Sequence, residues 1–399
     1  MSYLGWLDYS SGDRRRMLDV IELFRQKETV DELGIGSIRD TVADVLSPGT
    51  STIQTRARYF FFIPWIYMDL EWRGVSADHV AQEARKAEVR LIDHLADSSD
   101  PDGTIGIEAR ESLKRLPSAV YWAGLKTMGI RMFDGAQDRY HRLFDQCRGQ
   151  TGRHDDNGDL PEDSAGSVSW NPRLPKAPPG FPEGASLALT GEESAFMADR
   201  LAQQRPDSLL RFLVERRDVA DNAGSPWEHP ALDAMPRPLQ QWLHHGRCFS
   251  ELMYGAALLY NLMLARLSRA DLVKPYSSDF QEWAKNVIAR RDILVSWQTS
   301  EFWAWLRQRN TRLPIGAQDF SNNWIRMVLA NSNPVALADS DAAQELVHQR
   351  EWRLKGQRAR LDSAPHRDLW GGASSAYRLD YRWRITQTIA RDVIRGLEA

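Results

Sequence analysis

Residues 239–267 read LQQWLHHGRCFSELMYGAALLYNLMLARL, and this stretch decides the fold class. Its apolar side chains recur at intervals of three or four residues, the spacing of one face of an α-helix. The residues that form this face are Phe249, Leu252, Met253, Ala256, Tyr260 and Met263. The most apolar part, residues 249–264, is too short to span a bilayer and carries Glu251 and Asn261. The pattern therefore predicts a long, buried core helix.

The same periodicity continues on both sides of this helix. It predicts further helices near residues 10–24, 51–67, 76–95, 118–128, 190–201, 278–290, 294–309, 319–330, 338–355 and 376–397. Ser76 is expected to open the helix at 76–95, and Thr190 with Glu193 has the spacing of a capping box at the start of the helix at 190–201. Strand signals are poor, because Pro64 interrupts the one aromatic run that has strand-like composition, residues 59–67. The fold class expected from the sequence is mainly α and multi-helical.

One segment, residues 149–190, interrupts the helical pattern and is rich in Gly, Pro, Ser and Asp. A chain of 399 residues can form one large domain or two medium domains. We therefore expect a helical N-terminal domain (1–148), a loop or linker (149–190) and a helical C-terminal domain (191–399).

The composition of the chain limits the classes of function and the cellular location that are expected. The net charge of −3 excludes a nucleic-acid coat protein but allows a local basic patch. Two cysteines cannot build a disulfide framework. Residues 1–8 contain no basic region followed by an apolar run, so no signal peptide is expected. The expected location is the cytoplasm, with no membrane partner.

Motifs for catalysis and cofactor binding are absent from the sequence. It contains no Gly-Lys pair for a phosphate loop, no Gly-x-Gly-x-x-Gly, no Gly-x-Ser-x-Gly, no Cys-x-x-Cys and no His-Glu-x-x-His. We therefore expect no catalytic residues, no cofactor and no metal, and the chain is more consistent with a non-enzyme.

Two weaker chemical hypotheses remain, both at the start of the long helix. Some all-α ribonucleases use an Arg and a His with four to six residues between them, and Arg237 and His244 have this spacing. Four such pairs occur, about as many as chance gives for 43 arginines and nine histidines. His244, His245 and Cys248 share a helical face and could supply two zinc ligands, but no partner motif accompanies them.

Residues 50–59, Thr-Ser-Thr-Ile-Gln-Thr-Arg-Ala-Arg-Tyr, form the first candidate contact segment. They would place hydroxyl groups at the start of a helix, where free backbone N–H groups bind anions. Arg56, Arg58 and Tyr59 would add phosphate contacts. The alternative is a capped helix whose arginines pair with nearby acids such as Asp40 or Asp44.

The second candidate segment lies near the C-terminus. Residues 350–399 contain eleven Lys and Arg residues against six Asp and Glu, and aromatic residues lie among them. This combination suits contact with a nucleic-acid backbone and stacking on bases. The residues proposed to make the contacts are Lys355, Arg358, Arg360 and Arg384. The alternative is a pair of Arg-rich helices joined by salt bridges, such as Asp380 to Arg384.

Parts of both segments resemble a known family. The stretches are ELGIGSIRD (32–40), PGTSTIQTRARYFFFIPW (48–65), LKGQRARL (354–361) and YRW (381–383). They resemble a bacterial family of unknown function met in mobile and anti-phage defence loci, whose members are similar in length. The resemblance implies a role near nucleic acid, and it supplies no activity and no catalytic residues.

Three functional hypotheses follow. The first is a non-enzymatic, nucleic-acid-associated accessory subunit of a bacterial anti-phage defence complex, with DNA or RNA backbone and other defence proteins as partners. The second is a metal-independent ribonuclease of the helical-bundle kind. The third is a protein-interaction scaffold that uses its tryptophan-rich helices and binds no nucleic acid.

Overall fold

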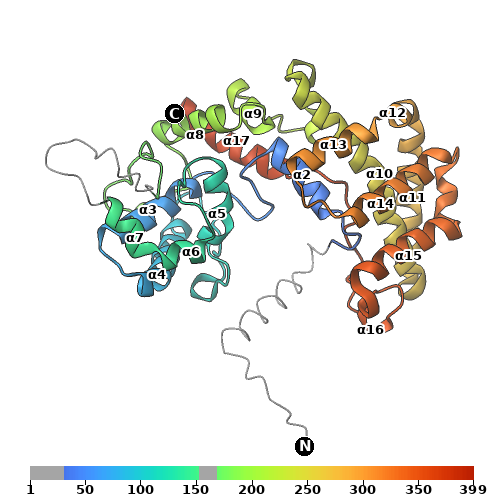
Figure 1. Cartoon of the computed structure of the whole chain (residues 1–399), viewed down its shortest axis with the longest axis horizontal. Helices are drawn as coiled ribbons and strands as arrows, with labels where there is room; N and C mark the ends of the chain where they lie inside the picture. Colours follow the sequence, from blue (N-terminus) through green and yellow to red (C-terminus); the bar gives the residue numbers. More distant parts are fainter. Residues whose placement is uncertain (1–30, 152–168) are drawn as a thin grey trace, which may run out of the picture. The chain divides into compact units, whose positions relative to one another are not determined.

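The computed structural model describes residues 31–151 and 169–399, and the predicted helix at 10–24 lies outside them. These ranges are mainly helical, which confirms the predicted fold class, and no strand occurs in them (Figure 1). A single isolated bridge pairs Arg131 with Trp170.

The chain divides into two compact units. The described residues of the first unit are 31–41 and 245–379, and those of the second are 42–151, 169–244 and 380–399. The boundaries fall inside helices α2 (Gly36–Leu46) and α10 (Arg237–Ser268). Residues on both sides of the expected linker at 149–190 therefore belong to the second unit, and 152–168 of that linker lie outside the described ranges.

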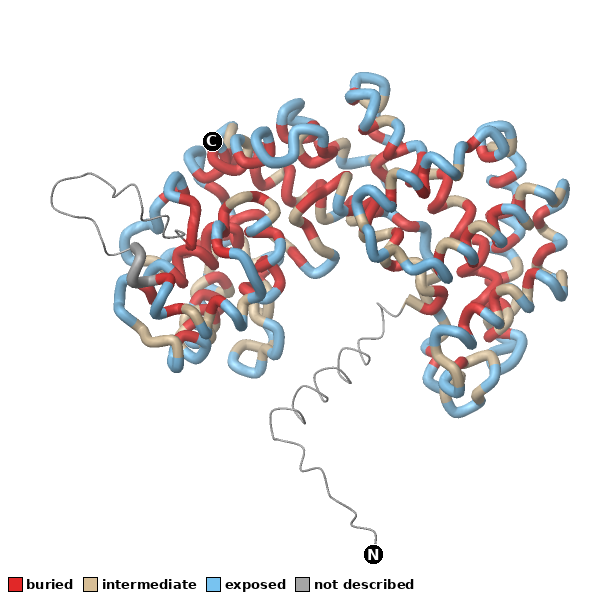
Figure 2. The backbone as a smooth tube through the Cα atoms, in the orientation of Figure 1, coloured by how far each residue is buried: buried red, intermediate tan, exposed pale blue. Residues whose placement is uncertain are grey.

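Helix α10 contributes the core of the first unit, as its sequence predicts. Phe249, Leu252 and Tyr260 are fully buried, whereas Met263 is only partly covered (Figure 2). Among the described helices, α10 is the one long and apolar enough to cross a membrane, and 83% of its most apolar window is buried. Core helices of globular proteins commonly meet the same criteria.

Six helices complete the first unit. They are α11 (Ala270–Ala289), α12 (Arg291–Ser296), α13 (Thr299–Arg309), α14 (Ile315–Ala330), α15 (Asp341–Lys355) and α16 (Ala364–Arg367). The single helix predicted at 294–309 is wrong, since the chain forms α12 and α13 with a break at Trp297. The Trp297 backbone is extended, and its indole N–H donates to Nδ1 of buried His245 at 2.7 Å. This hydrogen bond fixes the bend of the chain at Trp297.

The second unit contains eight helices in its described residues. They are α3 (Tyr59–Trp72), α4 (Ala77–Ala96), α5 (Pro117–Thr127), α6 (Gln137–Arg142), α7 (Phe144–Thr151), α8 (Gly191–Gln204), α9 (Leu209–Arg216) and α17 (Trp383–Glu398). The predicted capping box of Thr190 and Glu193 starts α8, and Ser76 precedes α4 as expected. Helix α17 packs against α8 and α9.

Short 3₁₀ turns connect several of these helices, at Arg110–Ser112, Pro226–Glu228, Leu232–Ala234, Pro334–Asp339 and Gly356–Arg358. Helix α17 begins seven residues later than the predicted helix at 376–397. Tyr381 and Arg382 have φ angles of 51° and 66°, in the left-handed region. An α-helix cannot extend back through two such residues, so residues 376–382 remain non-helical.

A hydrogen-bonded chain of polar side chains joins four helices inside the second unit. The Ser118 backbone N–H and hydroxyl donate to the Glu88 carboxylate at 2.8 and 2.7 Å. The Gln137 amide donates to the Ser118 and Tyr67 hydroxyls, and Tyr67 bonds to His141 Nε2 at 2.8 Å. Because Glu88 is 1% exposed, these bonds supply polar partners that water cannot.

Glu88 gives the protein a pH-dependent stability. Burial raises the pKa of Glu88 to about 7, although the Ser118 hydrogen bonds oppose the shift. The folded state therefore holds an extra proton between the unfolded pKa near 4.5 and about 7, so stability falls as pH rises through that window. The expected loss is on the order of 3 kcal/mol in urea unfolding. Glu88→Gln should flatten this slope, and an unchanged slope in that variant would contradict the assignment.

Candidate functional site

The first predicted contact segment becomes helical only at its last residue. Helix α3 begins at Tyr59, so the predicted helix over 51–67 is confirmed from residue 59 and wrong before it, and residues 50–58 are non-helical. The reason is tertiary: the backbone N–H groups of Thr55 and Arg56 donate to the Tyr121 hydroxyl, at 2.9 and 3.1 Å. These bonds to a side chain of α5 replace the helical hydrogen bonds, and the Ala57 N–H donates to Asp392, so these backbone groups are not available to bind an anion.

Arg56 and Arg58 use their guanidinium groups inside the protein. Arg56 Nε donates to both Asp392 oxygens at 3.0 Å, and its Nη1 donates to Asp100 at 2.9 Å. Arg58 Nη2 donates to Glu193 at 2.8 Å, and Arg58 is 7% exposed. The arginines of this segment pair with acids, as the alternative predicts, but not with Asp40 or Asp44.

Tyr59 is also internal. Its side chain is fully buried, and its hydroxyl accepts a hydrogen bond from the Ile105 backbone N–H at 2.9 Å. Its ring packs 5.2 Å from that of Tyr121. The ring therefore stabilises the packing of α3 against α5, and no face of it is open to stack on a base.

In the second predicted segment, two of the predicted contact residues pair with buried acids and two are exposed. Lys355 Nζ contacts the carboxylates of Glu32 and Glu351, and Arg360 Nη1 donates to Glu32 at 2.6 Å. Both glutamates are at most 1% exposed. Lys355 and Arg360 thus neutralise buried carboxylates of the first unit.

Arg358 and Arg384 are exposed, and neither has an ion pair among the described residues. Of the seven predicted contact residues, these two present free guanidinium groups. Arg358 belongs to the first unit and Arg384 to the second.

A pocket of the first unit gathers three other arginines. Arg247 and Glu251 lie one turn apart on α10, Arg290 follows the end of α11, and Arg378 comes from the non-helical segment before α17. We call this the arginine pocket; its free volume is about 90 Å³, and Trp283, Asn286 and Val287 complete its lining. Arg247 Nε donates to Glu251 at 2.9 Å, and Arg290 Nη1 contacts the other Glu251 oxygen.

The arginine pocket has an excess of positive charge. Glu251 offsets one of its three guanidinium charges, and Glu251 is the only acidic residue in the lining. A guanidinium has five N–H donors, and Arg247 and Arg290 each use one on Glu251. Arg378 lies with its guanidinium carbon 5.6 Å from the centre of the Tyr254 ring and has no ion pair in the described part of the chain. The arrangement suits a phosphate or carboxylate group.

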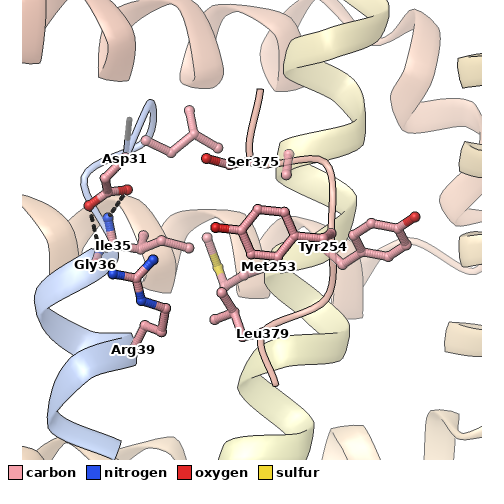
Figure 3. Close-up of a pocket in the computed structure, with 11 residues that line it drawn as sticks. Asp31, Ile35, Gly36, Arg39, Met253, Tyr254, Ser375 and Leu379 are labelled. Atoms are coloured by element: carbon pink, nitrogen blue, oxygen red, sulfur yellow. Dashed lines mark hydrogen bonds between the residues drawn. The ribbon is translucent and has the colours of Figure 1, made fainter. Parts of the chain in front are cut away.

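A second, mostly apolar pocket lies on the next face of α10. It is partly open to solvent and has a free volume of about 30 Å³, and we call it the apolar pocket. Figure 3 shows Ile35 and Arg39 of the α2 region pointing toward Met253 and Tyr254 of α10. The rest of the lining is Asp31, Leu33, Gly36, Ala257, Ser375, Tyr377 and Leu379.

The Asp31 carboxylate is already hydrogen-bonded to the backbone at the start of α2. Its carboxylate accepts hydrogen bonds from the backbone N–H groups of Ile35 and Gly36, at 2.9 and 2.5 Å (Figure 3). This negative charge stabilises the N-terminus of α2. Its oxygens are therefore satisfied. Arg39 is the cation in the lining, and its Nε donates to Asp40 at 3.0 Å.

A family model described as a family of unknown function, DUF6361, matches residues 1–394. The chain belongs to the DUF6361 family. No curated protein and no solved structure matches it.

In this DUF6361 chain, the start of α10 does not favour a metal site. His245 Nδ1 accepts the Trp297 indole N–H, and burial raises the pKa of the Cys248 thiol to about 12. Across residues 31–151 and 169–399, no three His, Cys, Asp or Glu side chains are grouped to hold a metal ion. Arg237 and His244 are both exposed.

The arginine pocket of this DUF6361 member was not predicted from the sequence, although the part of it on α10 has a recognisable spacing. Arg247, Glu251 and Tyr254 follow one another at i, i+4 and i+7, which places them on one stripe of the core helix. An Arg–Glu pair on a helix that is otherwise apolar marks a polar site. The partners Arg290 and Arg378 come from distant segments, and periodicity within one helix carries no information about them.

Proposed function

We propose that this DUF6361 protein is a nucleic-acid-associated, non-enzymatic accessory subunit of a bacterial anti-phage defence complex. The observation that carries the nucleic-acid part is the arginine pocket, where three guanidinium groups surround one carboxylate. The defence context rests on the resemblance of residues 32–40, 48–65, 354–361 and 381–383 to proteins of such loci.

The arginine pocket has the chemistry to bind a nucleic-acid backbone. Arginine forks form paired hydrogen bonds to phosphate oxygens, and such contacts fix position without reading sequence. Exposed Arg358 of the same unit supplies additional positive charge. We therefore expect binding that depends weakly on sequence and strongly on salt.

Arg378→Gln tests this proposal. We expect it to weaken binding of both DNA and RNA oligonucleotides and to reduce the slope of log K against log salt by about one ion. The measurement is a fluorescence-anisotropy titration from low to physiological salt. Arg309→Gln is the matched control, because it removes the same charge from an exposed position of α13 outside both pockets.

The outcomes separate the three functional hypotheses. No binding of DNA or RNA by the wild type at low salt would overturn the proposal and favour the scaffold. RNA cleavage that His244→Ala abolishes would favour the ribonuclease instead. Equal effects of the Arg378 and Arg309 changes would show that overall charge, not the pocket, drives binding.

One observation favours the scaffold as the second candidate. Trp72, at the end of α3, is 86% exposed, and Met68 one turn earlier is 40% exposed. Large apolar side chains exposed on one helical stripe are typical of a protein contact. An accessory subunit needs such a contact with its complex, so this surface is also compatible with the leading proposal.

A further inference from the structure

We propose that the arginine pocket binds the terminal phosphate of a nucleic-acid strand, so that the protein recognises strand ends that carry a phosphomonoester. The inference rests on the proposed function and deepens it, because it names the part of the strand that enters the pocket. The charge, the size and the hydrogen-bond donors of the pocket support it.

The charge of the lining matches a phosphomonoester. The guanidinium groups of Arg247, Arg290 and Arg378 and the single carboxylate of Glu251 leave two positive charges in excess. A terminal phosphate carries a charge of about −1.5 to −2 at neutral pH and offers three acceptor oxygens. A phosphate inside a strand carries one negative charge and has only two unesterified oxygens. The terminal group therefore matches the lining more closely.

The free volume of the pocket fits one phosphate group. It is about 90 Å³, which is roughly the space that three water molecules take in the liquid. A sugar or a base needs more room and would stay outside. The pocket lies between three segments of the chain, which are α10, the end of α11 and the segment before α17. A phosphate that is joined to the strand on one side only can enter such a pocket with three oxygens.

The arginines have N–H groups left for this ligand. Arg247 donates to Glu251 through Nε and Arg290 through Nη1, so both Nη groups of Arg247 and Nη2 of Arg290 have no hydrogen bond among the described residues. Arg378 lies over the Tyr254 ring, and a guanidinium stacked on an aromatic face still donates hydrogen bonds in its own plane. Tyr254 thus positions Arg378, and paired hydrogen bonds from such groups suit phosphate oxygens.

The packing of α11 on α10 holds the pocket in shape. The Trp283 indole N–H donates to the Glu251 carbonyl oxygen at 2.7 Å, and Trp283 is 2% exposed. Gly255 permits this close approach, because a Cβ atom there would collide with the Trp283 ring. A site that is already formed loses less conformational freedom when its ligand binds.

The test uses one oligonucleotide sequence with a 5′-phosphate, with a 3′-phosphate, or with hydroxyl groups at both ends. We expect the wild type to bind at least one phosphorylated form roughly tenfold more tightly than the hydroxyl form, because the pocket gains charge-assisted hydrogen bonds. Arg378→Gln should remove most of this preference. Arg378→Lys keeps the charge without the planar fork and should retain only part of it. Arg309→Gln is the control and should keep the wild-type preference.

Each result supports or overturns the inference. Equal affinity for all three forms would overturn it while the proposed backbone binding stands. Absence of binding to every form at low salt would overturn both. A preference that survives in Arg378→Gln would place the strand end elsewhere on the protein and overturn the inference. A nucleoside monophosphate that competes as well as the phosphorylated strand would overturn it in favour of a free nucleotide, and tighter binding of a phosphoserine peptide would overturn it in favour of a protein ligand.

Discussion

Glu351→Ala is expected to lower the free energy of unfolding by about 4 kcal/mol, the largest effect of a single substitution that this structure predicts. Glu351 is fully buried and accepts four hydrogen bonds. Their donors are the Tyr260 hydroxyl at 2.6 Å, Lys355 Nζ at 2.7 Å, and the backbone N–H groups of Arg360 and Leu361 at 2.9 and 3.0 Å. Alanine would leave all four without this partner.

The cost arises from desolvation. Lys355 would keep only the Glu32 carboxylate, which it shares with Arg360, and two partly buried cations would face one buried acid. An unpaired buried charge costs far more than the net gain from the pair it replaces. Urea unfolding measures the effect, and Glu345→Ala is the control, because it removes an exposed acid from the same helix at almost no cost.

A double variant tests whether charge is the cause. Glu351→Gln keeps an acceptor and the side-chain volume but removes the negative charge, and Lys355→Met removes the opposing cation. If the pair is the reason for the loss, Lys355→Met should cost less in the Glu351→Gln background than in the wild type. Strictly additive effects would show that the two side chains stabilise the fold independently.

This cluster also shows why the sequence overestimates the basic character of residues 350–384. A local count of charges finds an excess of cations, but Glu32 pairs with Lys355 and Arg360 from 323 and 328 positions away. Arg56 likewise pairs with Asp392 across 336 positions. Folding brings together partners that are this distant along the chain. A short window of sequence therefore contains only one member of each pair.

The helical fold itself was largely predictable, because its signal is local. Apolar spacing located α10, and the Thr190–Glu193 capping box located the start of α8. The errors lie where a distant side chain decides the backbone: Tyr121 holds residues 55 and 56 out of a helix, and His245 holds the bend at Trp297. No periodic pattern contains those contacts.

The candidate site was less predictable for the same reason. Its cations come from α10, from the end of α11 and from the segment before α17, and each looks ordinary in its own window. The residues singled out by sequence have the right chemistry but mostly internal partners. Positive charge with aromatic neighbours indicates nucleic-acid contact only where folding leaves the positive charge unpaired.

Asp392→Ala should be the second large effect, a loss of about 3 kcal/mol in urea unfolding. Asp392 of α17 is 5% exposed, receives both Arg56 bonds and also accepts the Ala57 backbone N–H at 2.8 Å. It fixes the turn segment 50–58 against the last helix of the second unit. Without it, the buried Ala57 N–H loses its acceptor, and the Arg56 guanidinium keeps only Asp100 and the Asp102 carbonyl.

Asp221→Ala is the matched control, because Asp221 pairs with Arg391 one position before Asp392 but is 67% exposed at its side chain. We expect no measurable change in its unfolding midpoint, as for other exposed ion pairs. The comparison also bears on function. If Asp392→Ala were as stable as Asp221→Ala, Arg56 would not be committed to the fold, and it would be available for the phosphate contact that its sequence context predicts. A large difference assigns Arg56 to the core and leaves phosphate binding to the arginine pocket.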